Sequence, residues 1–237
     1  MVVVEITGKA NAGKSTLARQ LSKKLSDLGF SSAFLSFALP LKTYLRNYLG
    51  VQKGTKPLKH YLNFFEFLAE LQKTLQEFLV KSETYIDLDV INKLINELRE
   101  DLLIGYECYF NFKQYKQGFR KLAQLIGTDI IRKIDESFFV RQIVRQIFNL
   151  KNSVDYVFID DFRFPNEDLE IVANFTKDVF KVYKIRISSD VEETHNHISE
   201  ILIDDLNVNL EVVRKGNKYS PDLNEIVGIL AKLNLRR

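Results

Sequence analysis

The chain has 237 residues, a length that suits one α/β core with room for a helical insertion and that is too short for two full enzyme domains. Its net charge is only +3, from 34 basic and 31 acidic residues scattered along the sequence, so nucleic-acid binding gains no support. The lone Cys108 forms no internal disulfide, no apolar run reaches the roughly 18 residues of a membrane span, and the chain opens on a strand pattern rather than a signal peptide, so we expect a cytoplasmic protein without membrane insertion.

The most informative segment follows the first predicted strand. Residues 2–7 are an apolar, β-branched run typical of a buried parallel strand. Residues 8–16 then match the phosphate-binding pattern G-x-x-x-x-G-K-[ST]. From Ser15 to Leu28 apolar residues recur at helical spacing, and Gly29 ends the predicted helix. Strand, loop and helix therefore follow one another in the order that a phosphate-binding loop (P-loop) requires.

The P-loop pattern assigns a chemical role to individual residues. Lys14 is the cation for the β- and γ-phosphates of ATP, and the Ser15 hydroxyl is a ligand of Mg²⁺. Thr16 either reaches the α-phosphate or only caps and packs the helix. ATP and Mg²⁺ are the expected cofactors, and backbone N–H groups complete a nucleotide-binding set of Gly8, Asn11, Ala12, Gly13, Lys14, Ser15 and Thr16.

The remaining patterns predict an α/β chain. Four further strand patterns alternate with helices, so we expect a five-stranded parallel sheet in a three-layer P-loop sandwich, with strands at residues 2–7, 32–37, 154–159, 179–187 and 210–214. Residues 51–116 are rich in Leu, Glu, Lys and Phe at helical spacing and predict a helical insertion. Residues 188–200 are polar and predict a lid-like segment. We interpret residues 1–237 as a single domain that contains both parts.

Shorter helices are predicted in the second half of the chain. Two of them, at residues 117–126 and 137–150, are separated by Gly127-Thr128, and Asp135 is placed to cap the second. Pro165 suits the first turn of a helix over residues 166–175, because a missing N–H is no loss there.

Charged residues at the ends of predicted strands are candidates for the chemistry. Asp160 and Asp161 end the strand at residues 154–159, where a P-loop enzyme keeps its Mg²⁺-associated carboxylate. Successive residues of a strand point to opposite faces, so one of the two should face the loop, although both could serve as turn residues. Arg163 follows at a position that suits a substrate phosphate, and the alternative is a salt bridge to Glu167.

Three more cations are candidates for phosphate contacts. Arg132 follows Asp129 by one helical turn and Lys42 follows Pro40, and each either binds an acceptor phosphate or is a solvated charge. Arg186 lies just before the lid-like segment and is a candidate contact of the nucleotide.

Several separated segments resemble the phage-type deoxynucleoside monophosphate kinases. These segments are Phe37-Ala38-Leu39-Pro40-Leu41-Lys42, Leu125-Ile126-Gly127-Thr128-Asp129 with Arg132, Asp160-Asp161-Phe162-Arg163-Phe164-Pro165-Asn166-Glu167 and, more weakly, His197-Ile198-Ser199-Glu200. The D-x-R-F pattern of the family falls on Asp161 and Arg163. Leu39 departs from the family, many members of which carry an acid there.

The resemblance implies transfer of the γ-phosphoryl group of ATP to a deoxynucleoside monophosphate, giving the diphosphate and ADP. It implies a viral origin and hence the host cytoplasm. It favours Asp161 over Asp160 and implies catalytic roles for Lys14, Asp161, Arg163 and Arg132. The acceptor side would use Lys42, Arg132, Arg163 and Glu167, the nucleotide side Arg186, and the metal Ser15 with Asp161 and Asp160.

Two other interpretations stay open from the residues. A P-loop kinase of a different small molecule would keep Lys14, Ser15 and Asp161 and use the insertion for another acceptor. A nucleotide switch would hydrolyse ATP slowly and need a partner, and its GTPase form is disfavoured because no N-K-x-D motif follows a strand. The sequence also leaves a homodimer open.

Overall fold

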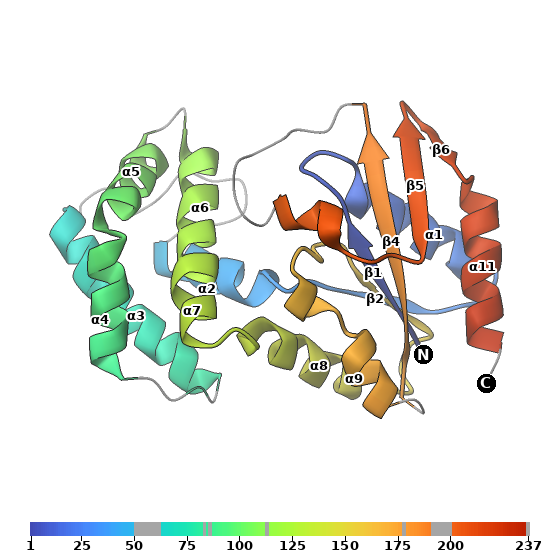
Figure 1. The fold of residues 1–237 in the computed structure, drawn as a ribbon, viewed down its shortest axis with the longest axis horizontal. Coiled ribbons are helices and arrows are strands. Elements are labelled where there is room, and N and C mark those ends of the chain that lie inside the picture. Colours follow the sequence, from blue (N-terminus) through green and yellow to red (C-terminus); the bar gives the residue numbers. More distant parts are fainter. Residues whose placement is uncertain are drawn as a thin grey trace. The chain divides into compact units, whose positions relative to one another are not determined.

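The computed structural model divides the chain into two compact units, which Figure 1 colours along the sequence. The sheet unit consists of Met1–Phe37 and Phe139–Arg237, and the helical unit consists of Ala38–Phe138. The structure describes residues 1–49, 63–82, 84, 87–111, 114–176, 179–190 and 201–235. The single domain stays a prediction, and parts of the predicted insertion and most of the lid-like segment, residues 191–200 with His197, lie outside the described residues.

Within the described residues, six strands form one mixed sheet in the order β2-β3-β1-β4-β5-β6. Strands β1 to β5 are parallel to their neighbours, and β6 is antiparallel to β5. The five predicted parallel strands are thereby confirmed, with their ends shifted by a few residues. Their bounds are β1 Val2–Thr7, β2 Ser32–Leu35, β3 Tyr156–Ile159, β4 Lys181–Ser189, β5 Leu210–Lys215 and β6 Lys218–Ser220.

The prediction of a wholly parallel, five-stranded sheet is wrong at one edge. After β5 the chain turns at Gly216, which has a φ of 58°, and returns as β6. Arg214 lies opposite Tyr219 in this hairpin. A three-residue strand is too short to show the alternation of apolar and polar residues by which strands are predicted.

The central strand β1 separates two different faces of the sheet. Val2, Val4 and Ile6 belong to the apolar core that β1 forms with α1 (Lys14–Asp27) and α11 (Leu223–Leu235). The alternate residues Val3, Glu5 and Thr7 point to the other face, and all three are buried. That face therefore takes two polar side chains into the interior.

The other helices of the sheet unit are α8 (Phe138–Leu150) and α9 (Glu170–Phe175), and α9 packs on β4. The Asp135 carboxylate accepts the backbone N–H of Ser137 at 3.2 Å, which confirms the predicted cap. The helix predicted over residues 166–175 is interrupted. A 3₁₀ turn, η2 (Pro165–Glu167), comes first, and α9 begins only after Asp168, whose side chain accepts the N–H of Glu170.

The helical unit contains α2 (Leu39–Leu49), α3 (Phe64–Lys81), α4 (Leu88–Glu97), α5 (Arg99–Phe110), α6 (Tyr115–Gln124), a π-helical segment η1 (Leu125–Ile131) and α7 (Arg132–Ile134). The two predicted helices are confirmed as α6 and α8, but Gly127-Thr128 lies inside η1, so the predicted break at these two residues is wrong and the first helix continues to Ile134. The helix continues because Leu125, Ile126, Ile130 and Ile131 are buried on both sides of the glycine. Gly118 lets α6 approach α5 closely, since a Cβ at this position would lie 2.1 Å from the backbone nitrogen of Tyr109.

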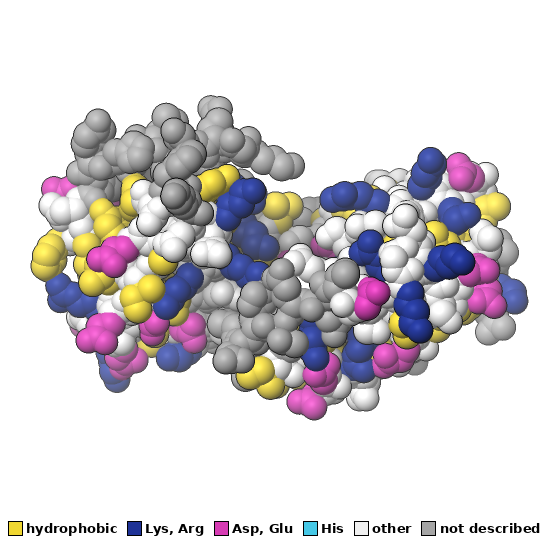
Figure 2. All heavy atoms as spheres, turned by 90° about the horizontal axis from the view of Figure 1, so that it is seen from above, with side chains coloured by type: hydrophobic (Ala, Val, Ile, Leu, Met, Phe, Trp, Pro, Cys, Tyr) yellow, Lys and Arg dark blue, Asp and Glu magenta, His cyan; other side chains and the backbone are white. Residues whose placement is uncertain are grey.

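No helix in the described part of the chain combines the length and apolar character that crossing a bilayer requires. Figure 2 shows Lys and Arg side chains interspersed with Asp and Glu side chains over the sheet unit. This mixture agrees with the small net charge, while the expected absence of nucleic-acid binding stays a prediction.

Candidate nucleotide site

The P-loop joins β1 to α1 through a backbone that glycine favours. Gly8, Asn11 and Gly13 have φ values of 146°, 62° and 101°. Gly13 is the N-cap of α1, makes no side-chain capping bond, and is followed by a first turn without an acidic residue. The positive end of the helix dipole, with no acidic residue beside it, therefore lies at the end of the loop, where it suits an anion.

Lys14 folds back over the loop. Its Nζ donates to the carbonyl oxygens of Gly8 at 2.5 Å and Lys9 at 2.7 Å. Within the loop, the N–H of Ala12 donates to the same Lys9 oxygen at 3.3 Å. The Ser15 and Thr16 side chains are exposed on the first turn of α1. Two carbonyls thus hold the Lys14 ammonium at the loop, and the oxygens of a bound phosphate could replace them as its acceptors.

Two of the loop's glycines lie close to neighbouring strands, and the backbone contact of Gly8 leaves no room for a side chain. A Cβ at Gly8 would lie 2.3 Å from the carbonyl oxygen of Ile187 in β4. A Cβ at Gly13 would lie 2.6 Å from Nη1 of Arg214 in β5. The P-loop therefore lies directly against the carboxyl ends of two parallel strands, the edge at which open α/β sheets bind ligands.

Asp160 and Asp161 follow β3 at the same edge, since β3 is the parallel neighbour of β1. The Asp161 carboxylate accepts the Ser36 hydroxyl at 2.6 Å and the Phe37 N–H at 2.9 Å, and so ties the end of β3 to the segment after β2. Asp160 is partly exposed and accepts no hydrogen bond from the described residues. Of the two carboxylates, Asp160 is the less engaged within the protein.

Glu167 has a structural task in the turn that carries Arg163. Its side chain is buried, and Oε2 accepts the backbone N–H groups of Arg163 at 2.8 Å and Phe164 at 3.1 Å. The predicted link between Arg163 and Glu167 therefore exists through the backbone. The carboxylate orders the turn from which the Arg163 side chain projects.

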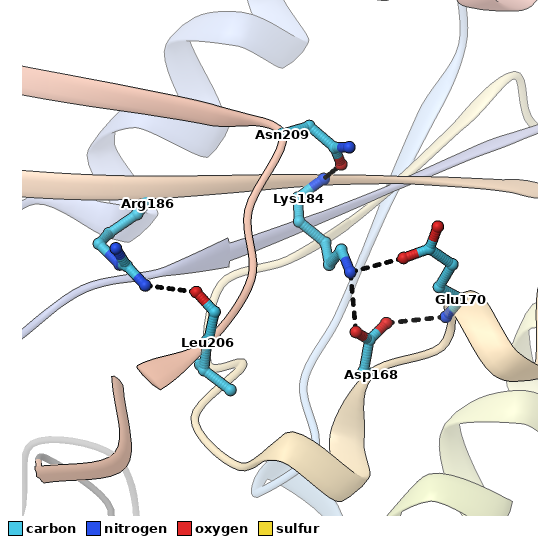
Figure 3. A network of polar contacts seen from close by, with 6 residues as sticks. All are labelled: Asp168, Glu170, Lys184, Arg186, Leu206 and Asn209. Atoms are coloured by element: carbon cyan, nitrogen blue, oxygen red, sulfur yellow. Dashed lines mark hydrogen bonds and ion pairs between the residues drawn. The ribbon is translucent and has the colours of Figure 1, made fainter. Parts of the chain in front are cut away.

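Arg186 anchors the chain before β5. Its Nη1 donates to Oε1 of Glu211 at 2.7 Å, and Nη2 donates to the carbonyl oxygens of Ile203 and Asp204. Nη2 also donates to the carbonyl oxygen of Leu206, the bond that Figure 3 draws. The first two of these carbonyls belong to the short 3₁₀ turn η3 (Leu202–Asp205). Arg186 was predicted to contact the nucleotide, but both of its terminal nitrogens are already bonded within the protein.

A buried polar cluster lies on the face of the sheet opposite α1. Lys184 Nζ contacts the carboxylates of Asp168 and Glu170, each at 2.7 Å (Figure 3). Burial lowers the pKa of Lys184, but the bonds to the two carboxylates outweigh it and raise the pKa overall. Glu5, beside Lys184 in the register, is completely buried, and neither of its carboxyl oxygens has a hydrogen-bond partner among the described residues.

The environment of Glu5 favours its neutral form. Burial is the main cause that raises the pKa of Glu5 well above its ordinary value, and the nearby charges of Asp168 and Glu167 raise it further. The nearby backbone N–H of Leu169, which makes no hydrogen bond of normal geometry to Glu5, and the charge of Lys184 act in the opposite direction, and burial outweighs both. Sequence analysis treated Glu5 only as part of an apolar strand and did not indicate this group.

Lys42 and Arg132, the predicted acceptor-side cations, belong to the helical unit. Lys42 lies on α2, where its N–H donates to the carbonyl of Ala38, and Arg132 begins α7. In the sheet unit, the P-loop and the two aspartates lie at the same edge of the sheet, and Arg163 follows β3 in the turn that Glu167 orders. The sheet unit also adds Arg214, which the sequence did not indicate.

The loop fits a nucleotide phosphate, because its N–H donors, Lys14 and the uncapped start of α1 all favour an anion. Among the described residues no three His, Cys, Asp or Glu side chains gather as metal ligands. Ser15 with one carboxylate suits Mg²⁺, which usually keeps waters and takes its other ligands from substrate phosphates.

No protein-family model matches the chain, and no curated protein matches it significantly in sequence.

Proposed function

We propose that the protein is a P-loop phosphotransferase that uses ATP and Mg²⁺. More particularly, we propose a deoxynucleoside monophosphate kinase, which transfers the γ-phosphoryl group of ATP to a deoxynucleoside monophosphate. The assignment of the α/β fold to a three-layer P-loop kinase sandwich is part of the same proposal.

One observation carries the proposal. The complete motif from Gly8 to Thr16 lies between a central parallel strand and a helix, and its three positive φ values and the inward-folded Lys14 are those of a phosphate cradle. An ordinary turn between a strand and a helix would need neither this sequence nor these positive φ values. The positive φ at Asn11 alone disfavours the conformation by about 1–2 kcal/mol.

The chain's own residues divide the work of phosphoryl transfer. Lys14 would exchange the Gly8 and Lys9 carbonyls for phosphate oxygens, and the loop N–H groups would fix the donor phosphates in line with the acceptor. Bound Mg²⁺, held by Ser15 and Asp160, would neutralise charge on the phosphate oxygens. Because Asp161 is bonded to Ser36 and Phe37, we assign it the positioning of the segment after β2.

The acceptor is inferred from the cations and from the family resemblance. A monophosphate acceptor needs positive side chains of its own, and Arg163, Lys42 and Arg132 are the candidates. Glu167 would act by ordering the turn of Arg163. The segments shared with phage-type deoxynucleoside monophosphate kinases then favour a deoxynucleotide over other phosphate acceptors.

The test is ADP formation from Mg²⁺-ATP with each common ribo- and deoxyribonucleoside monophosphate. The wild type, Lys14→Ala and Lys23→Ala would be compared, the last being a matched control because Lys23 is an exposed lysine of the same helix. We expect turnover stimulated by one or a few deoxynucleotides, lost in Lys14→Ala and kept in Lys23→Ala. ATP binding without acceptor-stimulated turnover would contradict the kinase and favour another acceptor or a switch.

A further inference from the structure

Arg214 stands apart from the other arginine at the same edge of the sheet. Arg186, in β4, bonds Glu211 and three backbone carbonyls through its terminal nitrogens. Arg214, in β5, makes one hydrogen bond to the described residues, from Nε to the carbonyl of Gly216 at 2.8 Å. Its Nη1 and Nη2 have no partner there, although the side chain is partly buried.

The guanidinium of Arg214 lies against the P-loop. The three atoms nearest to a Cβ built on Gly13 all belong to Arg214, with Nη1 at 2.6 Å, Cδ at 3.3 Å and Cζ at 3.5 Å. Gly13 is the residue at which the loop passes into α1. The open donors of Arg214 are therefore next to the N–H groups that would hold a phosphate.

The hairpin holds Arg214 in this place. Arg214 is paired with Tyr219 across β5 and β6, and the Nε bond to Gly216 fixes the side chain to its own turn. Lys9, on the same loop, is drawn toward Asp204 at 3.4 Å, whereas no carboxylate within the described residues pairs with Arg214. A guanidinium held in position with its fork unpaired is a ready bidentate ligand for a phosphate.

We propose that Arg214 is a further nucleotide-binding residue, a second cation beside Lys14 that bonds the phosphates of the nucleotide at the P-loop. This inference rests on the proposed function, because it takes the P-loop to bind a nucleotide. It adds β5 and its hairpin to the site.

The experiment measures binding of ADP, ATP and adenosine by calorimetry, with Mg²⁺ present, to Arg214→Ala and Arg214→Lys. Arg19→Ala is the control, since Arg19 is an exposed arginine of α1. We expect Arg214→Ala to bind ADP and ATP about ten- to one-hundredfold more weakly, with adenosine unchanged. Arg214→Lys should fall between the alanine variant and the wild type, because a lysine keeps the charge and loses the fork.

The outcomes separate this inference from the function on which it rests. ADP affinity within twofold of wild type in Arg214→Ala, together with loss of binding in Lys14→Ala, would overturn the role of Arg214 alone. Equal losses for ADP and adenosine would also overturn it, since they would indicate a contact with the base or a structural effect. A wild type that binds no nucleotide would overturn both. Thermal midpoints equal to that of wild type confirm that the variants are folded.

Discussion

Replacing Glu5 by glutamine should stabilise the protein at neutral pH. The Glu5 side chain is completely buried on the central strand, and both of its oxygens lack a hydrogen-bond partner among the described residues. Two further carboxylates, Asp168 and Glu167, act on it electrostatically, and the single opposing charge is that of Lys184. Glutamine keeps the shape of the side chain and removes its ability to ionise.

The magnitude follows from the linkage between proton binding and folding. Burial raises the pKa of Glu5 in the folded protein above the ordinary value of 4.5, so the folded state holds a proton that the unfolded chain releases. The contribution of Glu5 to stability is therefore fully present below pH 4.5 and is lost as the pH rises toward the folded-state pKa, by about 1.4 kcal/mol for each pH unit. Since pH 7 lies 2.5 units above 4.5, the loss there is at most about 3.4 kcal/mol.

The assay is urea unfolding of wild type and Glu5→Gln at several pH values between 4.5 and 8. We expect the variant to gain about 1–3 kcal/mol at pH 7, and the two proteins to converge as the pH falls toward 4.5. Glu97→Gln is the control, because Glu97 is an exposed carboxylate of α4, and its substitution should change the free energy of unfolding little. A variant that is less stable than wild type at pH 7, or a gain that does not depend on pH, would refute the reasoning.

Four further substitutions, of which Gly29→Ala is a control, test other close contacts. Gly118→Ala should cost at least about 3 kcal/mol in urea unfolding, because the added Cβ would lie 2.1 Å from the backbone nitrogen of Tyr109, and an unchanged midpoint would contradict this packing. Gly13→Ala should abolish ADP binding, whereas Gly29→Ala, also at positive φ but with open space around it, should lose about 1–2 kcal/mol of stability and bind ADP normally. Tyr156→Phe should cost about 1 kcal/mol by removing the buried bond to the carbonyl of Leu230 and should delete a phenol that burial holds at a pKa of about 12 in an ultraviolet titration.

The parallel part of the sheet could be predicted because β1, β2 and β3 are mostly apolar runs, and β4 and β5 keep apolar, often β-branched residues between charged ones. The prediction failed where an element depends on its partners in the fold rather than on the periodicity of its own residues. Strand β6 is held by pairing with β5, and the π-helical segment η1 passes through Gly127 because its flanking residues are buried. Neither pairing nor burial is visible in a short window of sequence.

The candidate site was predicted unevenly for a similar reason. The P-loop could be predicted because its spacing is itself the chemistry, and Lys14 and Gly13 lie where the motif requires. The partners of charged side chains could not be predicted, because they come from distant segments. Asp161 bonds Ser36, and Arg186 bonds Glu211. Arg214 had one signal, its position at the carboxyl end of the last parallel strand.

The contact of Gly8 with β4 determines when the loop can form during synthesis of the chain. Strand β1 leaves the ribosome well before its neighbours in the sheet, residues 156–159 and 181–186, are synthesised. The Ile187 carbonyl against which Gly8 lies follows them. Before Ile187 is in place, the loop lacks the backbone against which Gly8 packs. Nascent chains that end before residue 187 should therefore be unable to bind ATP. Retention of a growing chain on immobilised nucleotide would then mark the pairing of β4 with β1.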